Sequence, residues 1–242
     1  MNNYLLSIQY DGTKYNGWQY QNNARTIQEE IEKSISKILR KEIKIIGSGR
    51  TDTGVHALDQ KANFKTEENL NLFVFKYSLN SVLPNDISIN NIISVPENFH
   101  ARFDAKKRTY IYLISDKKSP FYYNYSYFYP VNLDIEYLNQ ISETLLGEKN
   151  FSAFCKKGSD EENKICNVYK ACWIKKKEIT IFKITSNRFL RGMVRAIVGT
   201  LLNAAKKKLN HKEIETIINN KNREFAGENV PAKGLFLYKV EY

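Results

Sequence analysis

The sequence is poor in the residues that build metal sites, disulfide frameworks and catalytic triads. It contains three histidines and three cysteines, Cys155, Cys166 and Cys172, with no Cys-x-x-Cys spacing. This odd number and this spacing predict neither a zinc site nor a disulfide framework. No serine or cysteine stands in a recognisable triad setting, so hydrolase chemistry has no support. We therefore expect reduced cysteines and no bound metal.

Long apolar segments are also missing. No run approaches the roughly 18 apolar residues of a membrane-spanning helix, and the first four residues lead straight into a strand pattern instead of a signal peptide. We therefore expect a cytoplasmic protein without membrane contact. A hydrophobic fraction of 42% with 13% aromatic residues indicates that this chain of 242 residues folds around a core.

Acidic residues are outnumbered by basic ones. The chain has 37 lysines and arginines against 26 acidic residues, a net charge of +11. Nucleic acid is the leading partner for such a charge. Drift in composition is the alternative, because lysine, asparagine and isoleucine rise together in chains from AT-rich genomes. Charge alone does not decide between the two.

Glycines are few, yet three of the eleven lie within the eight residues Gly47–Gly54. β-branched residues before this segment and alternating polar and apolar residues after it predict a strand on each side. Asp52 then lies on a glycine-permitted turn that a backbone or a ligand can approach closely. A dinucleotide fingerprint needs glycine in place of Asp52, and a phosphate-binding loop needs lysine in place of Val55. The segment is therefore not a nucleotide cradle.

Arg50 stands two residues before Asp52. In an extended segment, residues i and i+2 project to the same face, so we expect the guanidinium to meet the carboxylate. Such a pair would hold Asp52 ionised, as a nucleophile or a base requires. A structural ion pair has the same pattern, and an aspartate in a glycine loop is usually a turn residue bonded to its own backbone. The residues alone leave these interpretations open.

The segment Gly49-Arg50-Thr51-Asp52-Thr53-Gly54-Val55-His56-Ala57 resembles the signature of the tRNA pseudouridine synthases that modify positions 38–40 of the anticodon arm. Further blocks of the resemblance follow in the family's order. They are Tyr10–Gln19, Phe99–Phe103, Tyr110, Phe189–Gly199 and Gly234–Leu235. Residues 156–164 depart from the family's arginine-led segment, which leaves open how this loop holds tRNA.

The resemblance implies an isomerase, an intramolecular transferase that converts uridine to pseudouridine without metal or cofactor. Asp52 falls on the family's catalytic aspartate, which attacks the nucleoside, at base or sugar, so that uracil rejoins the sugar through carbon. A base inside a stem is out of reach, so it must first be flipped out. The resemblance implies that Arg50 helps to place the flipped nucleotide, Tyr110 stacks on the uracil, and Leu235 packs against it. Tyr112, two residues on, is a possible confusion with Tyr110.

The resemblance further implies a homodimer that grips the anticodon arm of tRNA across two subunits. Two alternatives stand beside it: a non-catalytic RNA-binding module of the same fold, and a pseudouridine synthase for another RNA. Binding alone cannot separate them.

Several cations are candidates for RNA contact. Arg188, Arg191 and Arg195 fall within roughly a 60° arc of a helix at 100° per residue, and few acidic residues accompany them. Lys14 stands among Tyr15, Trp18 and Tyr20, aromatics that either stack on bases or plug a small core.

Hydrophobic periodicity predicts the order strand, helix, strand, strand, helix, strand for the first half of the chain. This is the split βαβ pattern, a four-stranded antiparallel sheet with helices on one face, as in RNA-binding folds. The second half repeats the order. We therefore expect an α+β fold of two related, ferredoxin-like halves, with an N-terminal domain over residues 1–104 carrying the Asp52 loop and a C-terminal domain over residues 105–242. The resemblance adds a basic cleft between them. The expected helices are 27–39, 70–79, 134–146, 189–205 and 212–218.

Overall fold

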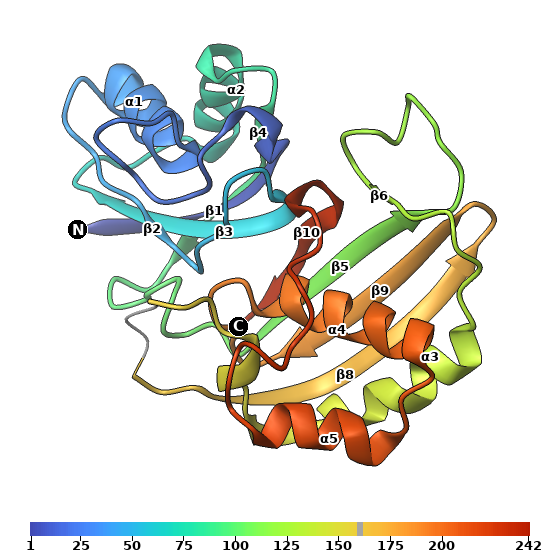
Figure 1. The fold of residues 1–242 in the computed structure, drawn as a ribbon. Coiled ribbons are helices and arrows are strands. Elements are labelled where there is room, and N and C mark those ends of the chain that lie inside the picture. Colours follow the sequence, from blue (N-terminus) through green and yellow to red (C-terminus); the bar gives the residue numbers. More distant parts are fainter. Residues whose placement is uncertain (159–161) are drawn as a thin grey trace. The chain divides into compact units, whose positions relative to one another are not determined.

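The computed structural model describes residues 1–158 and 162–242, and Figure 1 shows the course of the chain. It has the mixed α and β composition that the sequence predicts. The described residues form two compact units, Met1–Lys106 with Phe236–Tyr242, and Lys107–Leu235. The sequence-based boundary assigned all of residues 105–242 to one domain. In the structure the final segment belongs to the first unit, because Phe236 and Leu237 pair with a strand there.

The first unit contains the split βαβ sheet. Strand β1 pairs antiparallel with β4 on one side and β3 on the other, β2 pairs antiparallel with one end of β3, and β10 pairs parallel with the other end. The strands are β1 (Asn2–Tyr10), β2 (Ile46–Gly47), β3 (His56–Thr66), β4 (Ile87–Val95) and β10 (Leu235–Glu241). Helices α1 (Ile27–Leu39) and α2 (Leu72–Val82) lie side by side on one face of this sheet (Figure 1). The predicted order of elements is confirmed.

Helix α1 shows why these residues fold as they do. The Thr26 side chain accepts a hydrogen bond from the Glu29 backbone N–H at 3.4 Å, which caps the first turn. Ile27, Ile31 and Ile35 repeat at helical spacing and are fully buried. The helix holds its place because one face fills the core under the sheet.

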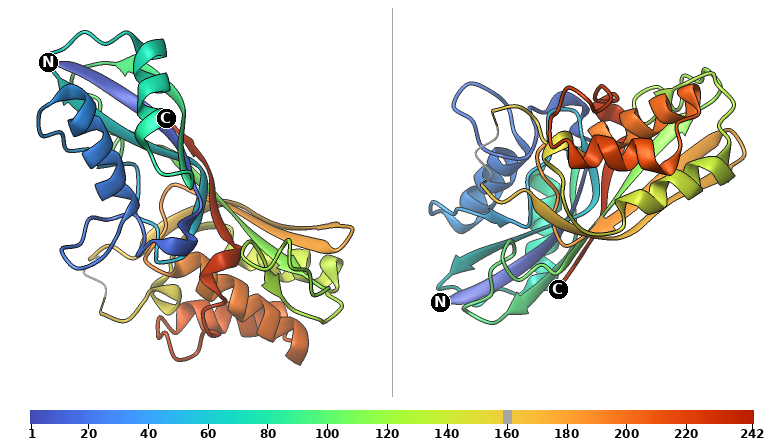
Figure 2. Two further views of the ribbon diagram at one scale, coloured as in Figure 1. Left: turned by 90° about the horizontal axis from the view of Figure 1, so that it is seen from above. Right: turned by 60° about the horizontal axis from the view of Figure 1, so that its bottom comes forward.

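The second unit is a four-stranded antiparallel sheet in the order β5, β9, β8, β7, and the short β6 pairs parallel with β5. Its strands are β5 (Lys107–Ser115), β6 (Tyr127–Phe128), β7 (Gly147–Asn150), β8 (Ile165–Lys176) and β9 (Ile179–Ser186). Its helices are α3 (Ile135–Ser142), α4 (Met193–Lys207) and α5 (His211–Asn219), with a 3₁₀ turn η4 (Ala232–Gly234) before β10. Figure 2 shows the three α-helices gathered on one face of this sheet. The predicted plan of a mainly antiparallel sheet with helices on one face holds in both units.

Helix α4 begins four residues later than the sequence predicts. We expected a helix from Phe189, but α4 begins at Met193. Gly192 precedes it with a φ of +73°, a left-handed conformation that breaks the helical path and suits glycine.

Among the described residues, no helix has the length and apolar character needed to cross a membrane.

Candidate active site

Asp52 lies on the turn between β2 and β3, as the glycine pattern predicts. The turn is closed by a hydrogen bond from the Val55 backbone N–H to the Asp52 carbonyl oxygen at 3.1 Å, and Gly54 takes a φ of +74°. The Asp52 side chain is half-buried, so a carboxylate stands at the surface of a defined turn. This geometry presents the carboxylate to a ligand.

A second backbone segment runs against this turn. The Thr51 carbonyl accepts a hydrogen bond from the Trp18 N–H at 3.1 Å, and the Gly54 N–H donates to the Tyr15 carbonyl at 3.3 Å. Gly17, at a φ of +87°, approaches so closely that a Cβ atom there would lie 2.4 Å from the Thr51 oxygen. Glycine is required at this position, because the two backbones are in contact. The contact holds the chain on the N-terminal side of Asp52.

Buried side chains complete the support of the turn. The Tyr10 and Thr51 hydroxyls are 2.8 Å apart, and the Gln60 Nε2 group donates to the Gly49 carbonyl at 2.9 Å. Ser48 Oγ donates to Gln60 Oε1 at 2.6 Å, and both side chains are almost fully buried. Because these buried polar groups have hydrogen-bond partners within the protein, they anchor the turn to the core.

The aromatic segment near the start of the chain serves mainly as core. Tyr15 and Trp18 are each 2% exposed, so of the two interpretations left open, plugging a core is the one that fits these residues, while Tyr20 is 45% exposed. Burial, together with the hydrogen bond from its hydroxyl to Asp86, raises the pKa of Tyr15. Lys14 is exposed at the end of a short 3₁₀ turn, η1 (Gly12–Lys14).

Arg50 does not make the contact that the sequence predicts. Its Nε donates to Gln19 Oε1 at 3.1 Å, and the ion pairs of the described residues include none between Arg50 and Asp52. The expectation treated residues 50–52 as a strand, whereas β2 ends at Gly47 and the chain then turns. Gln19 was missed as a partner, although it closes the resembling block that begins at Tyr10.

His56 is structural in this arrangement. Its ring is buried, stacks on Phe236 with centroids 4.6 Å apart, and accepts a hydrogen bond at Nδ1 from the Gly12 N–H at 3.1 Å. Nδ1 also lies 3.1 Å from Asp11 Oδ1. These contacts hold the ring between Gly12 and Phe236.

The second unit carries the two predicted residues that would hold a base. Tyr110, on β5, lies edge-on to Phe189 with ring centroids 5.1 Å apart. Tyr112 is fully buried and its hydroxyl donates to the Pro231 carbonyl at 2.8 Å. Burial raises the pKa of the Tyr112 phenol, which keeps it neutral. Its burial and its hydrogen bond give Tyr112 a structural role, which makes it less suitable than Tyr110 as the base-stacking tyrosine.

Leu235 begins β10 and is 6% exposed. Gly234 before it packs against Tyr112, where a Cβ atom would lie 2.7 Å from the ring. The short segment from Pro231 to Leu235 is therefore seated on β5 by one hydrogen bond and one glycine contact. These two contacts with Tyr112 position the backbone just before Leu235.

The three arginines do not form a stripe on one helix. Arg188 and Arg191 precede α4, and only Arg195 lies within it. Arg191 is exposed, whereas Arg195 is half-buried and its Nε donates to the Val230 carbonyl at 2.7 Å. The 60° arc assumed helical geometry from Phe189 onward, which Gly192 interrupts.

In the loop 156–164, residues 159–161 lie outside the described part of the chain.

Within residues 1–158 and 162–242, no group of three or more histidine, cysteine, aspartate or glutamate side chains is placed to hold a metal ion. Cys155 and Cys166 are buried and Cys172 is half-buried, all as free thiols. The candidate residues therefore offer a carboxylate and a guanidinium group in the first unit, and aromatic and aliphatic groups in the second.

Comparison with known proteins gives the family. A family model described as tRNA pseudouridine synthase matches residues 6–104 and 141–242. A tRNA pseudouridine synthase A from Caldicellulosiruptor bescii is 46% identical over 244 residues, covering 100% of both chains. Proteins of the same name from Clostridium acetobutylicum, 42% identical over 100% of both chains, and Bacteroides fragilis, 43% identical over 99% of this chain and 96% of the relative, are similar to it as well. The chain belongs to the tRNA pseudouridine synthase family, whose members are isomerases.

Proposed function

We propose that this protein isomerises uridine to pseudouridine at position 38, 39 or 40 of the tRNA anticodon arm, with the Asp52 carboxylate as nucleophile. The observation that supports the proposal most is the turn itself. A half-exposed carboxylate stands on a backbone held by Gly17 and Trp18 from one side and by Gln60 from another. Such support fixes the backbone that carries a reacting group. Family membership supports tRNA as the substrate.

The chemistry is an isomerisation and needs no co-reactant. Attack by the carboxylate forms a covalent adduct with the nucleoside, and the bond between uracil N1 and ribose C1′ breaks. Uracil turns, its C5 bonds to C1′, the C5 proton leaves, and N1 gains a proton. Release of the carboxylate returns Asp52 to its starting state. The target nucleotide is flipped out of the stem before attack.

The other predicted residues are given positioning roles in this proposal. Tyr110 stacks on the flipped uracil and Leu235 packs against it, roles that suit a strand tyrosine steadied by Phe189 and a leucine seated by Gly234. Arg50 is exposed and bonded to Gln19, so we assign it to the backbone of the flipped nucleotide rather than to Asp52.

Pseudouridine mapping on an unmodified tRNA transcript tests the proposal. We expect new pseudouridine at one or more of positions 38, 39 and 40. Product at other positions, or in another RNA only, would keep the chemistry and replace the substrate. Binding of tRNA without any product would identify a non-catalytic RNA-binding module and overturn the proposal.

We also propose that the protein acts in the cytoplasm as a homodimer that holds the anticodon arm across two subunits. The support is the resemblance to the family and the net charge of +11, which suits a large phosphate-rich ligand. Sedimentation of the wild-type protein at twice the mass of one chain is the expected result. A monomer with full activity would contradict it.

Arg188, Arg191, Arg195 and Lys14 are proposed to contact RNA, and the structure ranks them by their exposure. Arg191→Ala should weaken tRNA binding at every ionic strength and lower the slope of log K against log salt by about 1, the value for one lost phosphate contact. Arg191 is chosen because it is exposed, whereas Arg195 is half-buried.

The matched control is Lys206→Ala, which removes an exposed cation from the other end of α4. Binding titrations of all three proteins across a range of salt concentrations make the comparison. Equal slopes for wild type and Arg191→Ala would remove Arg191 from the RNA interface.

A further inference from the structure

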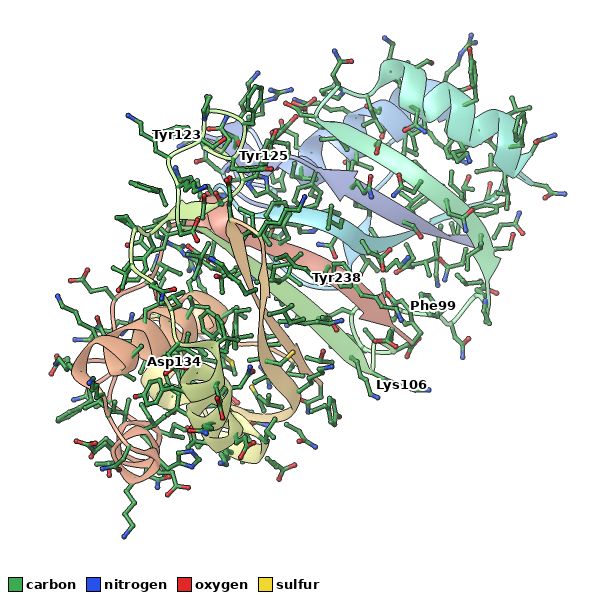
Figure 3. All side chains as sticks on the ribbon, turned by 90° about the vertical axis from the view of Figure 1, so that its right-hand side faces the viewer. Phe99, Lys106, Tyr123, Tyr125, Asp134 and Tyr238 are labelled. Carbon is green, nitrogen blue, oxygen red and sulfur yellow. The ribbon has the colours of Figure 1, made fainter. Side chains whose placement is uncertain are left out.

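An exposed aromatic loop joins β5 to β6 in the second unit, and the proposed function gives it no role. Figure 1 shows it extending beyond the strands, and Figure 3 shows Tyr123 and Tyr125 on it. We call residues 116–126 the tyrosine loop. Phe121 is 84% exposed and Tyr123 is 65% exposed, with Tyr122 and Tyr125 also at the surface. Rings exposed to this extent in one short segment mark a binding surface.

The tyrosine loop is an ordered turn and not a loose end. The Tyr122 carbonyl accepts hydrogen bonds from the Tyr125 N–H at 3.1 Å and from the Ser126 hydroxyl at 2.8 Å. Ser126 is buried, and the Tyr129 N–H donates to the Ser115 carbonyl at 2.9 Å as β6 joins β5. The rings are therefore held out in a preformed arrangement, which lowers the entropic cost of binding.

One ring is tied to the segment that carries Leu235. The Lys233 ammonium lies 3.8 Å from the centroid of the Tyr123 ring, a cation–π contact. Lys233 belongs to η4, two residues before Leu235, the leucine proposed to pack against the target base. Because Tyr123 keeps 65% of its surface exposed, the ring remains accessible to a ligand. The tyrosine loop thus lies next to the turn that leads into Leu235.

Charge and composition select the ligand. From Lys117 to Leu133 the sequence has no acidic residue, and its aromatic residues are tyrosine and phenylalanine. Lys117, Lys118 and Lys233 add cations, although Lys117 is paired with Glu178 at 2.8 Å. Aromatic rings beside cations suit unpaired bases and their phosphates. A second copy of a chain with net charge +11 would bring like charge to this loop, whose one acidic residue, Asp116, is paired with Lys175.

We propose that the tyrosine loop stacks on unpaired bases of the RNA substrate next to the target nucleotide, with Tyr123 as the main platform. This inference rests on the proposed function, since it adds a further contact with the same RNA substrate. The proposal accounts for the high solvent exposure of the aromatic side chains in this short loop. The contact contributes to binding and to placing the RNA, not to the bond-breaking step.

The test uses full-length tRNA transcripts with 2-aminopurine at single positions of the anticodon loop, a base whose fluorescence reports stacking. Wild-type protein should change the fluorescence at one or more positions. Tyr123→Leu should remove that change and raise the Kd for tRNA about 5- to 150-fold, the range for one base–aromatic stack. Tyr123→Phe should keep the wild-type values, because the ring is retained.

Two further measurements separate stacking from other causes. The slope of log K against log salt should be the same for Tyr123→Leu and wild type, since no phosphate contact is lost. Tyr77→Leu, which alters a tyrosine that is 74% exposed on α2, serves as the control and should bind tRNA as wild type does.

The outcomes are distinct. If wild-type protein neither binds nor modifies tRNA, the proposed function fails. If wild type does both and Tyr123→Leu matches it in Kd and fluorescence, the stacking proposal alone fails. If Tyr123→Leu lowers the sedimenting mass of the protein, the tyrosine loop is a surface between copies of the chain, which also overturns the proposal.

Discussion

The Asp52→Asn variant is expected to form pseudouridine at least about 10⁴-fold more slowly than wild type while still binding tRNA. An amide has nearly the shape of a carboxylate but no anionic oxygen, so the adduct cannot form. The bonds that hold the turn run through Thr51, Gly49 and Val55. The fold is therefore expected to survive the change. Release of tritium from tRNA labelled at C5 of uridine measures the rate, because C5 loses its hydrogen in the reaction.

Thr53→Ala is the control for Asp52→Asn. Thr53 is exposed and next in the chain, so its loss disturbs the same turn without touching the carboxylate. This control should keep a rate within a few-fold of wild type. Asp52→Ala belongs in the same series, because deamidation of an introduced asparagine would restore the aspartate. A rate for Asp52→Ala within tenfold of wild type would show that Asp52 is not the nucleophile.

Local patterns in the sequence predicted the elements that local physics controls. Helix α1 begins after Thr26 and ends at Leu39 as expected, because its cap and its isoleucine spacing both act within a few residues. The turn at Asp52 was predicted for the same reason, since Gly54 permits its backbone conformation. Elements of this kind are determined by residues that are close together in the sequence.

Contacts between distant segments were not predictable in the same way. The partner of Arg50 is Gln19, 31 residues away, which no spacing rule within the turn could indicate. The final strand joins the first unit through Phe236 and His56, a pairing between residues far apart in the sequence. The helix at Met193 begins late because Gly192 adopts a left-handed conformation, and a helical pattern of apolar residues does not report that choice. Tertiary structure decided each of these.

Gly17→Ala is expected to slow pseudouridine formation about 100-fold, although residue 17 has no part in the chemistry. An alanine Cβ would lie 2.4 Å from the Thr51 oxygen, so one of the two backbones must move. The φ of +87° adds backbone strain, and together these effects should lower the free energy of unfolding by about 2 to 3 kcal/mol. Because Thr51 precedes Asp52, the displacement moves the carboxylate away from its productive position.

Gly147→Ala isolates the displacement from the strain. Gly147 has the same φ of +87°, but a Cβ atom there would meet nothing within 4 Å. This control should lose about 1 to 2 kcal/mol of stability through backbone strain alone and keep the wild-type rate per folded molecule. Denaturant unfolding gives the stabilities, and tritium release at a temperature where both variants are folded gives the rates. Equal rates per folded molecule for Gly17→Ala and Gly147→Ala would mean that the close approach of Gly17 does not set the position of Asp52. A slow Gly17→Ala beside a normal Gly147→Ala would tie the reaction to the backbone contact that Thr51, next to Asp52, makes with Gly17.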